Sequence, residues 1–100
     1  MNSVEELLSS VESGREPPDG LTQPVLALWL TKKDRWDDAH NIAQAIDTPM
    51  GSWIHALLHR IEGDLGNAGY WYARAGKTAK ATRDGLDDEW EEIAVAVLSS

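Results

Sequence analysis

Three histidines, His40, His55 and His59, are the side chains in this chain whose type and spacing best suit chemistry. His55 and His59 are one helical turn apart and Glu62 follows three residues after His59, so a helix carries all three on one face. Such a face could hold zinc or another divalent ion, with His40 or Asp64 as a fourth ligand. The alternative is a polar helix face on which Glu62 pairs with a histidine.

Other motifs give little sign of an enzyme. The metalloprotease motif needs a glutamate directly after its first histidine, and Ala56 stands at that position. Glu62 beside His59 is the best acid–base pair, but no nucleophile accompanies it in the sequence. The segment from Gly63 to Gly66 lacks the lysine of a phosphate-binding loop. The sequence therefore favours a protein without catalytic residues, although it leaves the question of an enzyme open.

An aromatic cluster supplies candidates for contact with a protein partner. Helical spacing places Trp71 and Tyr72 on an inner face, whereas Tyr70 falls on the outer face with Arg74. An outward tyrosine beside an arginine is typical of interface residues, and a lone exposed aromatic is the alternative. The predicted partner contacts join this pair to polar residues of the preceding helix: Tyr70, Arg74, His55, His59 and Arg60.

The composition is that of a small acidic protein. Its 100 residues include 17 Asp and Glu against nine Lys and Arg, which gives a formal net charge of −8. An acidic surface repels phosphate groups, so we expect no nucleic-acid partner. The chain has no cysteine, which removes disulfides, thiol nucleophiles and cysteine-ligated metal sites.

Neither a secretory signal nor a membrane span is predicted. Residues Met1 to Glu6 carry acids where a signal peptide needs bases. The longest purely apolar run is Val25 to Leu30, which is far shorter than the about 20 residues of a membrane-spanning helix. We therefore expect a cytoplasmic protein with no membrane partner.

Apolar residues at helical spacing predict an all-α fold with five or six helices in a single domain, residues 1–100. Ser3, Asp34, Thr48 and Asp64 are the expected N-terminal caps. The run from Val25 to Leu30 also fits a β-strand, but its alanine and leucines favour a helix. Predicted helices cover residues 3–13, 35–46, 49–62, 65–75 and 86–98, a further helix opens at Pro24, and residues 77–85 form a loop.

Two segments of the chain repeat one pattern. Residues 34–46 align with residues 63–75, and Ala39 matches Ala68, 29 positions further on. Each segment follows a helix and begins with a tight turn, so the unit is a helical hairpin used twice within residues 24–76. A small residue where two helices cross lets them approach closely, which explains the two alanines.

The second hairpin carries a recognisable set of motifs: Gly63-Asp64-x-x-Asn67-Ala68 at the turn, Trp71-Tyr72 at an aromatic position and Ala75-Gly76 at a second small position. This set resembles the tetratricopeptide repeat and, more closely, its Sel-like relative. The first hairpin shares only Trp36, Ala39 and the spacing, and has Asp34 where the family usually has glycine. The period is also shorter than the usual about 34 residues.

The resemblance implies a groove that binds a peptide or a partner protein. Since about three units are usually needed for stability, the helices at 3–13 and 86–98 are expected to cap the two hairpins, and one of them could fill the groove. The stretch from Trp53 to Asp64 also resembles small uncharacterised bacterial proteins, and that likeness implies no activity.

Three functions are compatible with these features. The first is a small, non-catalytic protein–protein interaction module of the tetratricopeptide-like type that needs no cofactor. The second is a metal- or small-ligand-binding protein centred on His55, His59 and Glu62, with zinc as the candidate ion. The third is a structural subunit that forms a homodimer through exposed aromatic side chains.

Overall fold

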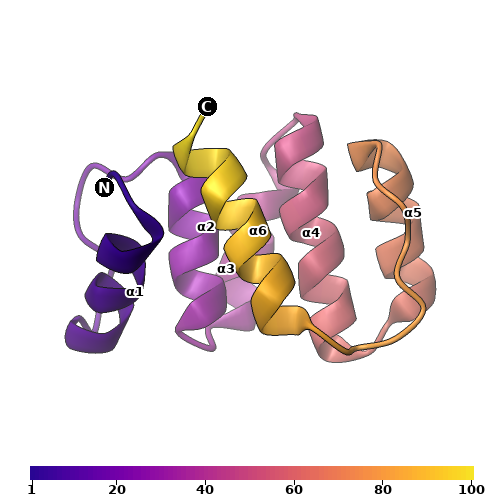
Figure 1. Cartoon of the computed structure of the whole chain (residues 1–100), viewed down its shortest axis with the longest axis horizontal. Helices are drawn as coiled ribbons and strands as arrows, with labels where there is room; N and C mark the ends of the chain where they lie inside the picture. The colour runs from indigo at the N-terminus through magenta and orange to yellow at the C-terminus, as the bar shows by residue number, and fades with distance from the viewer.

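Six α-helices make up the structure, a computed structural model that describes all 100 residues. In chain order they are α1 (Val4–Ser13), α2 (Gln23–Lys32), α3 (Trp36–Gln44), α4 (Pro49–Glu62), α5 (Leu65–Ala75) and α6 (Leu86–Leu98), as Figure 1 shows. The all-α prediction is confirmed, and the run from Val25 to Leu30 is helical. None of the six combines the length and the apolar character that crossing a membrane would require.

Most of the predicted helix ends are confirmed because their local signals act as expected. The side-chain oxygens of Ser3, Thr48 and Asp64 each accept a hydrogen bond from the backbone N–H three residues later, at 3.1, 3.1 and 3.2 Å. Each bond satisfies an amide that the start of a helix leaves without a partner. Gly63 ends α4 with a φ of 90°, a left-handed conformation that glycine adopts without a steric penalty.

Asp34 does not cap α3, so this part of the prediction is wrong. Its own backbone is left-handed, with a φ of 64°, and Arg35 occupies the N-cap position. Helix α3 therefore begins at Trp36, and it ends at Gln44 instead of the predicted Ile46. The turn between α2 and α3 needs a left-handed residue, which aspartate tolerates better than most side chains do.

Helices that are neighbours along the chain pack as two hairpins, α2 with α3 and α4 with α5. Contacts between α3 and α4 join the hairpins, while α1 packs at one end against α2 and α6. Helix α6 runs diagonally across α2 and α4 (Figure 1). Helix α4 is thus the central element, in contact with α2, α3, α5 and α6.

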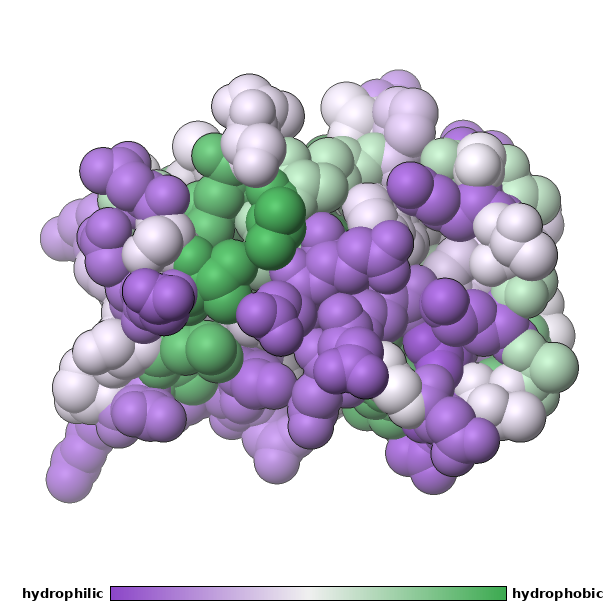
Figure 2. All heavy atoms as spheres, in the orientation of Figure 1, coloured by the Kyte–Doolittle hydropathy of each residue, from purple (hydrophilic) through white to green (hydrophobic).

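The core is a single cluster of 20 buried apolar residues drawn from all six helices. Ala39 and Ala68, the matched alanines of the two hairpins, are fully buried, as their predicted role at helix crossings requires. Figure 2 shows that hydrophilic side chains cover much of the outer face, apart from an apolar patch near the C-terminal end of α6. Only Met1, Tyr70 and Val95 are large apolar side chains that remain exposed.

A buried ion pair joins α4 to α6, between Arg60 and Glu89. The two side chains are 0% and 2% exposed. The Tyr72 hydroxyl donates to Glu89 Oε1 at 2.5 Å, and Trp53 Nε1 donates to Glu89 Oε2 at 3.1 Å. Both carboxylate oxygens therefore have hydrogen-bond donors, which compensates for the cost of removing the charge from water.

The same arginine fastens the loop of residues 77–85 to the core. Arg60 donates to the backbone carbonyls of Thr82 and Asp84, at 3.1 and 2.6 Å. Arg83 donates in return to the carbonyls of Arg60 and Ile61, at 3.1 and 2.5 Å, and so satisfies the end of α4. The loop is irregular, as predicted, yet hydrogen bonds from the charged side chains of Arg60 and Arg83 hold it against α4.

Ionisation in this network follows from its packing. Burial alone would lower the pKa of Arg60, but the hydrogen bonds to Tyr72 and Glu89 outweigh it and raise that pKa. Burial, followed by the hydrogen bond to Glu89, raises the pKa of Tyr72. Arg60 therefore stays charged and Tyr72 stays neutral at physiological pH.

The Arg60→Met substitution is expected to lower the free energy of unfolding by about 3–5 kcal/mol, because it leaves Glu89 buried without its counter-charge. The double variant Arg60→Met with Glu89→Gln removes both charges and should recover part of this loss. Urea unfolding followed by circular dichroism measures both. Arg15→Met, at an exposed arginine, is the control and should change stability by no more than about 0.5 kcal/mol. A similarly small effect at Arg60 would contradict the expectation.

Candidate metal centre

The three histidines of the chain meet where α3 packs against α4. His55 and His59 lie one turn apart on α4, with their rings stacked at a centroid distance of 4.8 Å. His40 extends from α3, and its Nε2 lies 2.9 Å from Nε2 of His55. One ligand nitrogen of each histidine lies within 4.8 Å of the others. These three residues are called the histidine cluster below.

Two tryptophans enclose the histidine cluster. Trp36 stacks on His40 at a centroid distance of 4.8 Å, and Trp71 of α5 stacks on His55 at 3.9 Å. As a result His55 is only 4% exposed and His59 only 6% exposed. The polar helix face expected from the sequence is therefore an interior surface, because α3 and α5 cover it.

Glu62 pairs with His59, as in the alternative interpretation of this helix face. Its Oε2 lies 2.6 Å from Nδ1 of His59. With the proton on Nδ1, this bond leaves a free lone pair on Nε2 of His59 and fixes the orientation of the ring. Histidines that bind metal ions are commonly held in this way by a carboxylate.

Asp64 lies on the exposed rim of the site and not inside it. It offers a carboxylate oxygen within 4.8 Å of His59 and Glu62, as part of a separate group of three. The sequence offered His40 or Asp64 as the fourth ligand, and of these two it is His40 that lies with His55 and His59. Glu62 and Asp64, both exposed, are called the rim carboxylates below.

Burial favours the neutral form of two of the three histidines, His40 and His55. Burial first, and then the charges of His40 and His59, lower the pKa of His55 to about 4. Burial and the charge of His59 also lower the pKa of His40, against the opposing influence of Glu62 and Asp37. Both imidazoles are thus neutral at pH 7. Nδ1 of His55 is buried without a hydrogen-bond partner.

The residues expected to touch a protein partner are divided between surface and interior. Tyr70 is 56% exposed, and Nη1 of Arg74 lies 3.3 Å from its hydroxyl oxygen. Arg60 is 0% exposed, and His55 and His59 are also buried. A partner that docks on the surface of α5 would therefore meet Tyr70 and Arg74, whereas the other three are enclosed by α3, α5 and α6.

Sequence reasoning missed the two enclosing tryptophans as part of this site. Helical spacing marked Trp71 only as an inward-facing side chain, and Trp36 entered only through the comparison of the two hairpins. A usable signal was present for one of them, because Trp36 and His40 are four residues apart in a helix and must therefore contact each other. No comparable signal links Trp71 to His55, since they belong to different helices.

Comparison with known proteins found no matching family model, no matching curated protein and no matching solved structure. The tetratricopeptide-like resemblance stays a prediction. The function has to be inferred from this chain's own side chains, since an all-helical architecture alone is compatible with many functions.

Stability should decrease as the pH falls from about 6.5 to about 4. His55 takes up its proton near pH 6.5 in the unfolded chain but only at about 4 in the folded protein, so the folded state binds fewer protons in this window. Acid therefore favours unfolding, by about 3 kcal/mol at most from this residue. His40 changes stability in the same direction.

Urea unfolding at several pH values tests this expectation by comparing slopes, not absolute stabilities. The variant His55→Gln should show a shallower loss of unfolding free energy between pH 6.5 and 4 than the wild type does. The carboxylates contribute equally to both proteins, so the difference between the slopes isolates the histidine. Equal slopes would contradict the assignment of a depressed pKa to His55.

Proposed function

We propose that this protein binds a divalent transition-metal ion at the histidine cluster, His40, His55 and His59. The observation that carries the proposal is the convergence of three imidazole nitrogens, from two helices, within 4.8 Å of one another. In a tetrahedral zinc site with bonds of about 2.0–2.1 Å, neighbouring ligand nitrogens are about 3.3 Å apart. The 2.9 Å between His40 and His55 therefore requires only a small adjustment.

The chemistry of these ligands supports a transition metal of the zinc, copper or nickel type. Imidazole nitrogen suits these ions, whereas calcium and magnesium prefer oxygen. The lowered pKa values of His40 and His55 keep their lone pairs free at pH 7, so the ion does not have to displace protons. In this proposal Glu62 orients His59, in place of the direct ligand role expected from the sequence.

Metal binding would have a mechanical consequence for the fold. His40 belongs to α3 and the other two ligands to α4, so the ion would connect the two hairpins. A ligand that binds only the folded state stabilises it by an amount that depends on its concentration relative to Kd. The proposal therefore predicts a metal-dependent change in stability as well as binding.

Zinc at 100 times its Kd should raise the free energy of unfolding by about 2.7 kcal/mol and the Tm by roughly 10 °C or more. A thermal melt with and without chelator measures the shift, and calorimetric titration should give one ion per chain. His40→Gln should lose both effects. Asn41→Gln places the same side chain at the adjacent exposed position and should keep them. A wild-type Tm that zinc does not change would contradict the proposal.

A second function is favoured by the surface of α5. Tyr70 projects into solvent, and the guanidinium of Arg74 lies 5.8 Å from its ring centroid and 5.3 Å from that of Trp71. The two side chains thus support each other in a fixed arrangement, which lowers the entropy lost when a partner binds. We propose that this pair contributes to a protein–protein interaction module, as the sequence suggests. The face formed by α2 and α4 is less suitable for a partner, because α6 packs across it.

Tyr70→Ala and Arg74→Glu should each abolish capture of a protein partner in a pull-down while the Tm and the circular dichroism spectrum stay close to wild type. Their side chains are exposed, so they add little to the core. Arg15→Glu makes the same charge change at an unrelated exposed position and should retain the partner. Capture that survives both substitutions on α5 would rule out this surface.

A further inference from the structure

The histidine cluster shares one residue with a second group of metal-binding side chains. His59, Glu62 and Asp64 offer ligand atoms that all lie within 4.8 Å of one another. His59 is 6% exposed, whereas the side chain of Glu62 is 40% exposed and Asp64 also faces solvent. A single imidazole therefore connects the buried cluster to the exposed rim carboxylates.

We propose that the rim carboxylates form a loading site, where a hydrated divalent transition-metal ion is captured before it passes to the histidine cluster. This inference rests on the proposed metal-binding function. A buried ligand needs a route by which the ion arrives, and two of the three imidazoles, those of His55 and His59, are only 4% and 6% exposed. The shared residue, His59, places the start of such a route at Glu62 and Asp64.

Each rim carboxylate has one oxygen held in place and one available. Oε2 of Glu62 is bonded to His59, and Oδ1 of Asp64 accepts the backbone N–H of Asn67 at 3.2 Å. The second oxygen of each group has no hydrogen bond within the protein. Gly63 is the one residue between Glu62 and Asp64, and its left-handed backbone forms the sharp turn at the end of α4. One oxygen on each held carboxylate is thus available to an arriving ion, at a lower cost of ordering flexible side chains.

Charge and ligand preference give the route a direction. Two carboxylates at the rim attract a cation from a distance, which the neutral imidazoles of His40 and His55 do not do. Zinc, copper, nickel and cobalt then bind more favourably to several nitrogens than to carboxylates and water. The ion is therefore captured rapidly at the rim and resides at equilibrium among the histidines.

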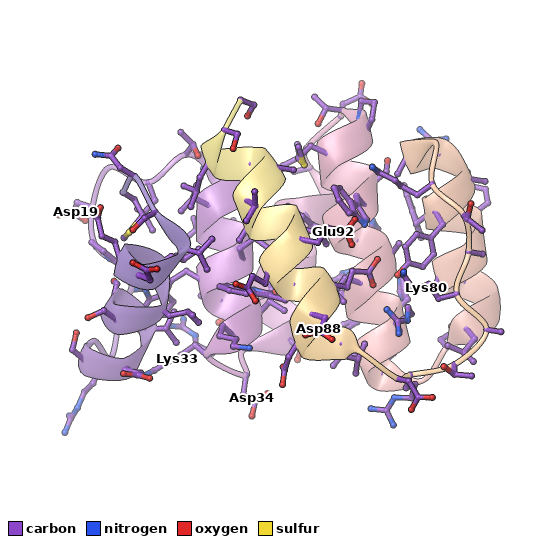
Figure 3. All side chains as sticks on the ribbon, viewed as in Figure 1. Asp19, Lys33, Asp34, Lys80, Asp88 and Glu92 are labelled. Atoms are coloured by element: carbon purple, nitrogen blue, oxygen red, sulfur yellow. The ribbon has the colours of Figure 1, made fainter.

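Stopped-flow mixing with cobalt(II) tests this proposal, with tryptophan fluorescence as the signal because Trp36 and Trp71 enclose the cluster. The variant Asp64→Asn removes one charge and retains the capping oxygen of α5, so it should fold. Asp64→Ser also caps a helix and serves as a second variant. Asp88→Asn is the matched control, at an exposed carboxylate on α6 that Figure 3 labels.

A loading site accelerates arrival and departure alike. In Asp64→Asn the association and dissociation rate constants should therefore both fall, by about the same factor of roughly 3–10, and Kd should stay within about twofold. The association rate should also become less sensitive to added salt. The control should match the wild type in every constant.

Two results would overturn the loading site without touching the proposed function. Faster dissociation and a weaker Kd in Asp64→Asn would mean that Asp64 is a ligand in the final site. Rate constants equal to those of the wild type would mean that the ion arrives by another route. If the wild type itself fails to bind cobalt(II) or zinc, the proposed metal-binding function is what fails.

Discussion

Helix α4 is covered on every side, and the remainder of the structure depends on how its polar residues are accommodated. Its residues from Gly51 to Arg60 are all buried, although they include two histidines and an arginine. A buried polar group must find a partner within the protein or destabilise the fold. Helices α3, α5 and α6 supply several of those partners, and the loop of residues 77–85 and Glu62 of α4 itself supply others.

The two polar clusters on α4 satisfy this requirement to different degrees. Around Arg60 both oxygens of Glu89 have donors, and the remaining donors of the arginine reach backbone carbonyls. Such complete pairing is what a structural network needs. In the histidine cluster, the Nε2 atoms of His40 and His55 are hydrogen-bonded to each other at 2.9 Å, but Nδ1 of His55 has no partner. This unsatisfied nitrogen distinguishes the histidine cluster from the fully paired network around Arg60 and is consistent with the metal-binding function proposed above.

In the proposed function, protons and metal ions compete for the same atoms of the histidine cluster. The burial that lowers the pKa values of His40 and His55 favours acid unfolding, and in this proposal it also leaves both imidazoles able to bind an ion at neutral pH. The proposed metal affinity and the acid sensitivity then have one physical cause, the removal of imidazoles from water. The rim carboxylates stay in solvent, where their charge can act on ions outside the protein.

The sequence by itself determined the features that depend on neighbours along the chain. The caps at Ser3 and Thr48, the end of α4 at Gly63 and the shared face of His55 and His59 all follow from helix geometry and local hydrogen bonds. Asp34 is the exception, since the turn it occupies is dictated by how α2 meets α3.

Only the tertiary structure decided which polar residues are buried and which of them meet. His40 reaches His55 across 15 positions of sequence, and Arg60 reaches Glu89 across 29. Helical periodicity specifies the face on which a side chain lies, but not the helix that covers that face. That choice depends on the packing of the whole core, because only distant segments that pack together can bury α4 on all sides.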